Sequence, residues 1–422
     1  MMGLRSFLTF TAGLSCAFSV ACGGGGKSST TTTNPGPTQT IVTSGANVAP
    51  IVVNSGPAAS VGSPYANGAF ATVTVCVPGT STCQAIDGVL VDTGSSGLRI
   101  LSSALTSVTL PQQKAASGDP VVECFPFVIG YTWGPVETAD VAVASEKASS
   151  VPIQVLSDSD YTPPTACSSL GTSSDTLANL GANGIIGVGL FTQDCGSYCE
   201  AVQTAPGNIN LYYECSSTSS CTPVGESLAQ QVLNPVSLFT TDNNGVIIEL
   251  PAVSGGAPSV SGSLVFGIGT ESNNGLAGAT VYTADSSGNF TTTCSSPCTG
   301  TTGTAPYPGF IDSGSNGYYF LDDTVTGVPP TCSDNTSFYC PSSTVTVTAT
   351  NEGVNQASGS VSFQVANADT LFSNSADFAY GDLGGTFDTP LSFDFGLPFF
   401  FGRNVFTGLQ NTTNYLNGYW AY

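Results

Sequence analysis

Two short stretches of the sequence each place an aspartate in a tight turn that contains a hydroxyl residue. In GVLVDTGSSGLRI, residues 88–100, Asp92 ends a mostly apolar run, and in FIDSGSNGYYF, residues 310–320, Asp312 does the same. Two carboxylates a few ångströms apart cannot both ionise easily, so such a pair shares one proton over a range of pH. A pair of this kind can act on a water molecule as general base and on a carbonyl oxygen as general acid.

The neighbours of both aspartates suit such a pair. A glycine in each turn lets the backbone approach its counterpart without a Cβ atom. We expect the hydroxyls of the residues that directly follow the aspartates to hydrogen-bond between the turns, and the later serines to hold the outer carboxylate oxygens. The supporting residues are Thr93, Gly94, Ser95, Ser313, Gly314 and Ser315.

The chain also repeats a coarser pattern. The first aspartate turn is followed by NGIIGVGLF and the second by PFFFGRNVF, so each half has an apolar strand, an aspartate turn and a later apolar-glycine segment. This internal duplication predicts two similar lobes that meet at an interface. The two carboxylates would meet there.

With these four segments, the sequence resembles the pepsin-like aspartic peptidases, and within them an uncharacterised group of bacterial secreted lipoproteins. The resemblance implies an all-β, bilobal pepsin-like acid protease fold with two similar β-barrel-like lobes and a few short helices. It implies an aspartic endopeptidase that needs no cofactor or metal, acts on a peptide or protein substrate and works as a monomer. The catalytic residues would be Asp92 and Asp312.

Two other functions stay open. The chain could be a catalytically silent pepsin-like protein that binds peptides on the cell envelope, or a structural surface protein in which both turns are ordinary loops. Intact aspartates, hydroxyls and glycines in both turns favour the enzyme.

The family covers its cleft with a hairpin flap that carries a tyrosine. IGYTWGPVETADVAVA lies at the corresponding place, which makes Tyr131, Trp133 and Gly134 the candidate flap and substrate-binding residues. The alternative is an ordinary hairpin aromatic. Arg99 stands where the family has a tryptophan that partners the flap tyrosine. Arg403, in FGRNVF, is similar to an arginine of the retroviral aspartic proteases, and we interpret it as structural.

The charge of the chain excludes some functions. The formal net charge is −22, and the chain without residues 1–21 has 5 basic residues against 28 acidic ones. So few Lys and Arg cannot form the basic patch that nucleic acid requires. The chain has no histidine, which excludes Ser-His and Cys-His catalysis.

The N-terminus has the features of a bacterial lipoprotein signal. A positive start precedes an apolar stretch that is short for a membrane span, and small residues precede Cys22. We expect a signal peptide over residues 1–21 and a flexible tether, lipidated at Cys22, over residues 22–45. An ordinary secretory signal is the alternative. The lipid would anchor the protein to the membrane of the cell envelope, outside the cytoplasm, and to the outer membrane of a Gram-negative cell.

We expect the lobes to span residues 46–245 and 246–422. Twelve cysteines follow Cys22, and an even number in an exported protein indicates disulfides. Metal binding is the alternative, but no second ligand type accompanies these spacings. Spacing alone leaves the connectivity open. The favoured pairs are Cys76–Cys83, Cys124–Cys167, Cys195–Cys199, Cys215–Cys221, Cys294–Cys298 and Cys332–Cys340.

Secondary structure is predicted to be mostly strands. Apolar-alternating runs with Gly, Pro, Asn or Ser between them occur at residues 71–77, 139–145, 151–156, 245–251, 262–269, 343–350 and 359–366. The best candidates for helices are residues 225–233 and 402–410.

Overall fold

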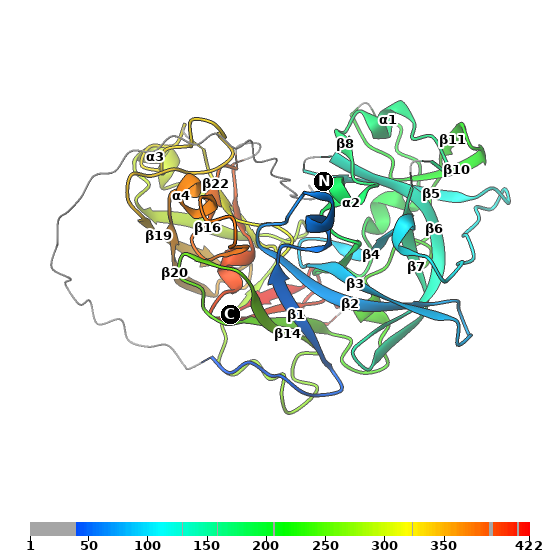
Figure 1. Ribbon diagram of the computed structural model, residues 1–422, viewed down its shortest axis with the longest axis horizontal. Helices are drawn as coiled ribbons and strands as arrows, with labels where there is room; N and C mark the ends of the chain where they lie inside the picture. The colour runs from blue at the N-terminus through cyan, green and yellow to red at the C-terminus, as the bar shows by residue number, and fades with distance from the viewer. Residues whose placement is uncertain are drawn as a thin grey trace.

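A computed structural model describes residues 39–422, apart from positions 129, 158, 206, 323, 388–390 and 412. The expected signal peptide, Cys22 and most of the tether lie outside the described residues. Figure 1 shows two lobes side by side, with β1 and β14 crossing the base between them. The all-β, bilobal fold predicted from the sequence is confirmed.

The first lobe and the base share one sheet of sixteen strands. In spatial order these strands are β11 (Ser220–Pro223), β10 (Tyr212–Ser217), β5 (Val121–Phe127), β6 (Gly130–Val143), β7 (Glu146–Leu156), β4 (Ser96–Leu101), β9 (Gly184–Val188), β3 (Cys83–Asp92), β2 (Gly68–Cys76), β1 (Val48–Asn54), β14 (Val260–Phe266), β12 (Gly245–Leu250), β24 (Arg403–Gly408), β25 (Tyr419–Ala421) and β15 (Val281–Thr283), with β8 (Thr172–Ser173) beside β6.

The second lobe has a sheet of seven strands. Their order is β20 (Ser358–Val365), β19 (Val345–Glu352), β16 (Phe290–Ser296), β17 (Pro306–Ile311), β23 (Phe393–Phe395), β18 (Tyr318–Phe320) and β22 (Gly384–Gly385). A separate pair joins β13 (Gly256–Ala257) to β21 (Ala379–Tyr380).

Helices are short. The α-helices of the described chain are α1 (Thr165–Ser168), α2 (Leu177–Leu180), α3 (Gly300–Gly303) and α4 (Ala368–Phe372), and the 3₁₀ turns are η1 (Pro57–Val61), η2 (Ser102–Ala104), η3 (Gly196–Glu200), η4 (Pro235–Leu238) and η5 (Leu397–Phe400). None of the described helices is long and apolar enough to cross a membrane.

The strands follow from alternation in the sequence. In β19 and β20, which pair antiparallel, Val347 and Ala349 of one strand and Val361, Phe363 and Val365 of the other are buried, while the residues between them are more exposed. Side chains of a strand alternate between its two faces, so a period of two puts one face in the core. Each buried aliphatic or aromatic side chain contributes about 1.5–3 kcal/mol. Each of the seven predicted alternating runs overlaps a strand, although several extend one to three residues beyond it.

The two predicted helices are wrong. Residues 225–233 turn instead, because the buried Gln231 side chain donates to the backbone oxygens of Gly196 and Glu226, and Leu233 forms a bridge to Gln193. Residues 403–408 are the strand β24, which lies between β12 and β25. Contacts with distant strands decide both segments, and a local pattern cannot reveal them.

The expected tether is bound to the protein at its end. The Gln39 side chain donates to the backbone oxygens of Leu250 (3.0 Å) and Arg403 (2.7 Å), and the Val42 amide donates to a Glu249 carboxylate oxygen (2.6 Å). Residues 39–45 therefore lie along the base of the molecule. A freely moving tether would have to end before Gln39.

The twelve cysteines form the six favoured disulfides. Cys76–Cys83 closes the hairpin between β2 and β3, as the sequence suggests. Cys124–Cys167 encloses the longest segment, with a sequence separation of 43. The other pairs close separations of 4 to 8 residues.

Candidate active site

The two aspartate turns meet at the interface between the lobes. Asp92 is the last residue of β3, and Asp312 directly follows β17. Both side chains are buried, and a side-chain hydrogen bond joins the two carboxyl groups. The residues lie 220 positions apart, so the fold alone brings them together.

Reciprocal hydrogen bonds connect the turns behind the carboxyl groups. The Ser313 amide donates to Thr93 Oγ1 (2.9 Å), and the Thr93 amide donates to Ser313 Oγ (3.1 Å). Each hydroxyl then donates to a backbone oxygen of the opposite strand, Thr93 to Ile311 (3.1 Å) and Ser313 to Val91 (2.7 Å). The two turns thus form one nearly symmetric unit.

Equivalent backbone and serine atoms lie around each carboxyl group. Gly94 N donates to Asp92 Oδ1 and Gly314 N donates to Asp312 Oδ1, both at 2.8 Å. Ser95 donates to Asp92 Oδ2. Ser315 Oγ lies 3.0 Å from Asp312 Oδ2. The structure therefore gathers all eight predicted residues of the two turns.

Glycine is required in both turns by close approach. A Cβ atom on Gly94 would lie 2.5 Å from the Asp312 carboxyl carbon, and one on Gly314 would lie 2.7 Å from Asp92 Oδ1. Carbon atoms do not approach this closely without displacing their neighbours. Any side chain at these positions would push the carboxyl groups apart.

The two carboxyl groups both bind a proton more tightly than a free aspartate does. Burial raises the pKa of Asp92, but hydrogen bonds from Asp312, Ser95 and Gly94 and the charge of Arg99 act against this rise. Burial raises the pKa of Asp312 well above its usual range, and the charges of Asp92 and Asp394 raise it further. Both shifts favour a pair that holds one proton over a range of pH.

One segment beneath the turns was assigned wrongly from the sequence. In the first lobe the prediction is correct: β9 runs parallel to β3, with Ile186 opposite Val91. In the second lobe β23 takes this place, with Phe395 opposite Ile311, so the apolar-glycine segment is residues 393–397. The predicted FFFG, residues 399–402, instead leads from η5 into β24.

The candidate flap residues pack on the side of the hairpin that carries a disulfide. Tyr131 and Trp133 share a buried cluster with Cys124, Cys167 and Tyr213. Trp133 packs edge-on against Tyr213, with ring centroids 5.5 Å apart. The structure therefore uses both side chains to fix β6 against its surroundings.

The opposite face of the hairpin carries different aromatic residues. Phe125 and Phe127 alternate with the residues of the disulfide face and belong to a cluster that includes Tyr65. Gly134 has a packing role, because a Cβ atom there would lie 1.9 Å from the Val155 backbone oxygen. Phe127 lies on this face, opposite Gly130 at the end of the hairpin. No motif in the sequence marks it.

Arg99 holds the hairpin by ion pairs. Its guanidinium is fully buried, with Nη2 at 2.9 Å from Glu123 Oε1 and 2.8 Å from Asp194 Oδ2, and it lies 3.6 Å from the centroid of the Phe125 ring. Nη1 donates to the Ser96 backbone oxygen. Because Glu123 and Phe125 belong to β5, Arg99 connects the strand after the first aspartate turn to the hairpin.

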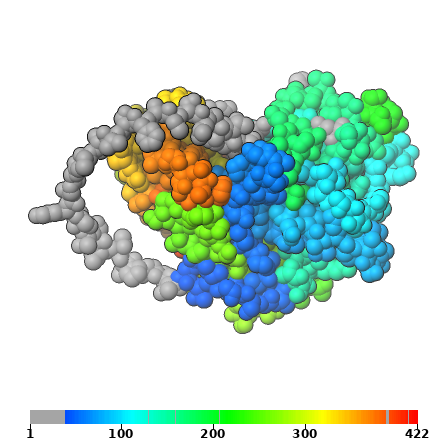
Figure 2. Space-filling model, in the orientation of Figure 1, coloured from blue at the N-terminus to red at the C-terminus, as the bar shows by residue number. Residues whose placement is uncertain are grey.

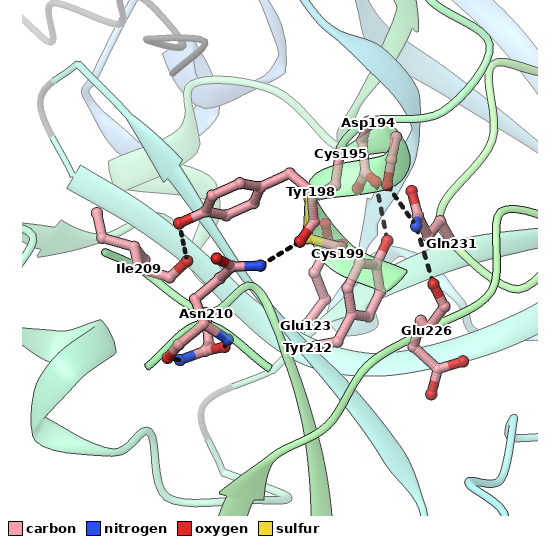
Figure 3. Close-up of a disulfide and its surroundings, with 12 residues drawn as sticks. Glu123, Asp194, Cys195, Tyr198, Cys199, Ile209, Asn210, Tyr212, Glu226 and Gln231 are labelled. Carbon is pink, nitrogen blue, oxygen red and sulfur yellow. Dashed lines mark hydrogen bonds between the residues drawn. A yellow bond between two sulfur atoms is a disulfide. The ribbon is translucent and has the colours of Figure 1, made fainter. Parts of the chain in front are cut away.

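Two acids compete for this one arginine. Figure 3 shows Asp194 next to the Cys195–Cys199 disulfide, with the Tyr212 hydroxyl donating to Asp194 Oδ1 (2.9 Å). Burial raises the pKa of Asp194 well above its usual range, and the neighbouring Glu123 raises it further. The guanidinium balances one negative charge, so the second acid favours the protonated form of Asp194.

Arg403 braces a loop, as expected. Its Nη1 atom donates to the Phe399 backbone oxygen (2.8 Å), and its guanidinium lies 4.5 Å from the centroid of the Phe399 ring. The arginine thus holds η5, which follows the segment beneath the second aspartate turn. Its role is structural.

Two residues near the site carry no motif in the sequence. Asn67 donates to the backbone oxygens of Asn316 (2.8 Å) and Tyr380 (2.9 Å) and accepts from the Tyr380 amide (2.6 Å), so it connects the lobes. Its positive φ of 54° is one that asparagine tolerates well. Burial raises the pKa of the Tyr65 phenol, and the charges of Asp92 and Asp312 act in the same direction.

The segment with Tyr65 and Asn67 belongs to the early part of the chain. Figure 2 shows that part, in blue, in the middle of the visible face, between the two lobes. Its sequence, YANGAF, reads as a turn before a strand. Only the folded chain reveals that it reaches both lobes.

The fold and the site define a bilobal all-β protein with a hydrogen-bonded aspartate pair between its lobes. Residues 43–422 match the family described as "Protein of unknown function (DUF3443)", and the chain belongs to that family. No curated protein matches the chain. Among solved structures, it is similar to an aspartic proteinase from Irpex lacteus, with 15% identity, a TM-score of 0.49, and coverage of 89% of this chain and 96% of that one.

Proposed function

We propose that the protein is an aspartic endopeptidase that hydrolyses peptide bonds with a water molecule activated between Asp92 and Asp312. The observation that carries the proposal is the hydrogen-bonded carboxyl pair, in which each group has its own backbone donor. Such a pair can hold one proton and one negative charge side by side. Peptide hydrolysis requires both an acid and a base of this kind.

We assign Asp92 as the base and Asp312 as the acid, because a third acid, Asp394, shares Ser315 with Asp312 and its charge favours the protonated form of Asp312. Asp92, the carboxylate, takes a proton from the water molecule while the water oxygen bonds to the carbonyl carbon. Asp312 gives its proton to the carbonyl oxygen, which produces a gem-diol. Asp92 then gives its proton to the amide nitrogen, a gem-diol hydroxyl returns a proton to Asp312, and the C–N bond breaks. The pair ends in its starting state.

The donors around the pair favour catalysis over silent binding. Hydrogen bonds to Asp92 from Ser95 and Gly94 stabilise a carboxylate in a buried site, where the charge would otherwise be costly. A site that only binds a peptide has no need to keep a buried carboxylate beside a second acid. The polar set is therefore better suited to proton transfer.

The substrate would be a peptide or protein met outside the cytoplasm. The lipid anchor at Cys22 and the tether predicted from the sequence would keep the enzyme on the cell envelope. The disulfides support export, because they form in oxidising compartments.

A quenched fluorescent peptide library tests the proposal. The purified wild-type protein should cleave library members at acidic pH, pepstatin should block the cleavage, and D312N should not cleave. Pepstatin binding without cleavage would favour the silent binding protein instead. Absence of both binding and cleavage would refute the site as proposed.

A further inference from the structure

A third carboxyl group lies behind the aspartate pair. Asp394, in β23, is 1% exposed, and its Oδ2 atom lies 2.6 Å from Ser315 Oγ. The same Ser315 Oγ atom lies 3.0 Å from Asp312 Oδ2. Ser315 therefore sits between two acids.

The number of hydrogen atoms available to Asp312, Ser315 and Asp394 limits which hydrogen bonds they can form. The Ser315 hydroxyl has one hydrogen and can donate it to one of the two acids only. The other acid can hydrogen-bond to Ser315 Oγ only if it is protonated and acts as the donor. A distance of 2.6 Å is typical of a hydroxyl that donates to a carboxylate, whereas 3.0 Å is at the long end of the range for a hydroxyl. Ser315 thus donates to Asp394, and Asp312 keeps its proton.

The first lobe lacks this third acid. Ile186 lies opposite Val91, and Phe395 lies opposite Ile311, so the residue before each of them is equivalent. That residue is Ile185 in the first lobe and Asp394 in the second. The hydroxyl of Ser95 consequently goes to Asp92, while the hydroxyl of Ser315 goes to Asp394.

We propose that Asp394 is a positioning residue of the site: as a carboxylate it takes the hydroxyl of Ser315 and thereby makes Asp312 the member of the pair that holds the shared proton. This inference rests on the proposed function and explains how two nearly identical turns acquire different roles. Asp92 receives a hydroxyl donor and serves as the base. Asp312 does not receive one and serves as the acid.

The charges around Asp394 agree with this role. The charge of Asp394 contributes to the raised pKa of Asp312, and it also contributes to the raised pKa of the Tyr319 phenol. Tyr319, on the neighbouring β18, donates its hydroxyl to Asn316. The described arginines bond elsewhere, Arg99 to Glu123 and Asp194 and Arg403 to Phe399.

The consequence is a wider pH range for the pair. A negative charge close to Asp312 delays the loss of its proton as the pH rises. The active form, with one proton on the pair, then persists to higher pH than two aspartates alone would allow. This would suit an enzyme that works in a weakly acidic or near-neutral envelope.

D394N tests the proposal, because it keeps the shape of the side chain and removes its charge. With ¹³Cγ-aspartate labelling, the titration midpoint of the Asp312 carboxyl signal should fall by about one pH unit or more in D394N. The basic limb of kcat/KM on a quenched peptide should move down with it. E249Q is the matched control: Glu249 is also buried, in β12, and bonds to Val42 and Asn404, away from the pair. It should move neither midpoint.

An unchanged Asp312 midpoint in folded D394N would overturn the proposal. If D394N does not fold, the wild-type protein decides, because Asp394 should be ionised at pH values where Asp312 is still protonated. The reverse order would overturn the proposal as well. The carboxyl titration does not require that the protein cleaves a peptide. A protein that cleaves no peptide would refute the proposed function, and the Asp312 midpoint would still decide this inference.

Discussion

Thr93 and Ser313 exchange hydrogen bonds across the interface between the lobes, each accepting the backbone amide of the other at 3.1 Å or less. Since both hydroxyls are buried, each also donates to a backbone oxygen of the opposite lobe. The distance between the two carboxyl groups is therefore set by four hydrogen bonds, which involve no part of a substrate. The arrangement of the pair therefore depends on the protein alone.

Thr93→Val should weaken this connection with little change in shape. It leaves the Ser313 amide without its acceptor, which typically costs about 1–3 kcal/mol of stability. Looser carboxyl groups should lower kcat/KM on the order of 10- to 100-fold. Chemical unfolding and peptide hydrolysis measure the two effects. Thr72→Val is the control, since Thr72 bonds to Asp87 on the exposed surface; an equal effect there would contradict the account.

Arg99→Met should destabilise the protein strongly at neutral pH. The change leaves Glu123 and Asp194 buried without their cation, and breaking a buried ion pair typically costs about 3–5 kcal/mol. The loss should shrink at acidic pH, because burial raises the pKa of Asp194 and this acid can then be neutral. Urea unfolding at acidic and neutral pH measures the difference.

Lys147→Met is the control for the arginine variant. Lys147 pairs with Asp140 at 3.2 Å, but its side chain is 53% exposed. An exposed pair contributes about 0–1 kcal/mol. The arginine variant should lose more stability than this control, and its loss should depend on pH. If either expectation fails, Arg99 does not neutralise the charge of the buried acids.

The free energy of unfolding should be greatest at acidic pH. Burial, together with a neighbouring acid in each case, raises the pKa of Glu137 and of Glu226 from 4.5 to about 7. A raised pKa means that folding favours the protonated form, so the contribution is fully present below the unfolded pKa and is lost as the pH rises through about 7. Asp140, whose pKa is lowered by hydrogen bonds and Lys147, acts in the opposite direction.

Melting temperatures across this pH range check the prediction. They should fall between mildly acidic and slightly alkaline pH, and the fall should be smaller in E137Q and E226Q, which remove the titrating groups. A melting temperature that rises through this range would contradict the assigned direction.

The chemistry of the site could be predicted from the sequence because it is carried by local motifs. The glycines and hydroxyl residues that support Asp92 and Asp312 lie within three residues of each aspartate, so a short motif contains them all. The short disulfides were similarly predictable, since Cys215 and Cys221 can meet only across one hairpin. The alternating strands were predictable from their period.

The contacts around the site could not be predicted, because they depend on strands that are far apart in the sequence. Asp394 interrupts the apolar run of residues 393–397. The uninterrupted FFFG therefore fits the apolar-glycine pattern better from the sequence alone. Tyr131 is a plausible flap tyrosine until the register of β5 and β6 places it on the face of Cys124. A one-residue change in hairpin register exchanges the two faces, and the sequence does not fix that register.

Cys22→Ser tests the predicted anchor. The wild-type protein should partition into detergent, and the variant should be released in soluble form or remain unprocessed. One lipid chain binds membranes only weakly, so several acyl chains are expected on the mature protein, which intact mass measurement can count. A wild-type protein found entirely in the soluble fraction would contradict the anchor.

The most direct test of the central claim is the kcat/KM of the wild type, D92N, D312N and the double variant on one cleaved peptide. Two carboxyl groups that share a proton act as a unit, so each single change should lower kcat/KM on the order of 10⁴-fold or more, and the double variant should be no worse than either. All variants should stay folded, as checked by their melting temperatures. Losses that multiply in the double variant, or substantial activity in either single one, would contradict the shared-proton pair.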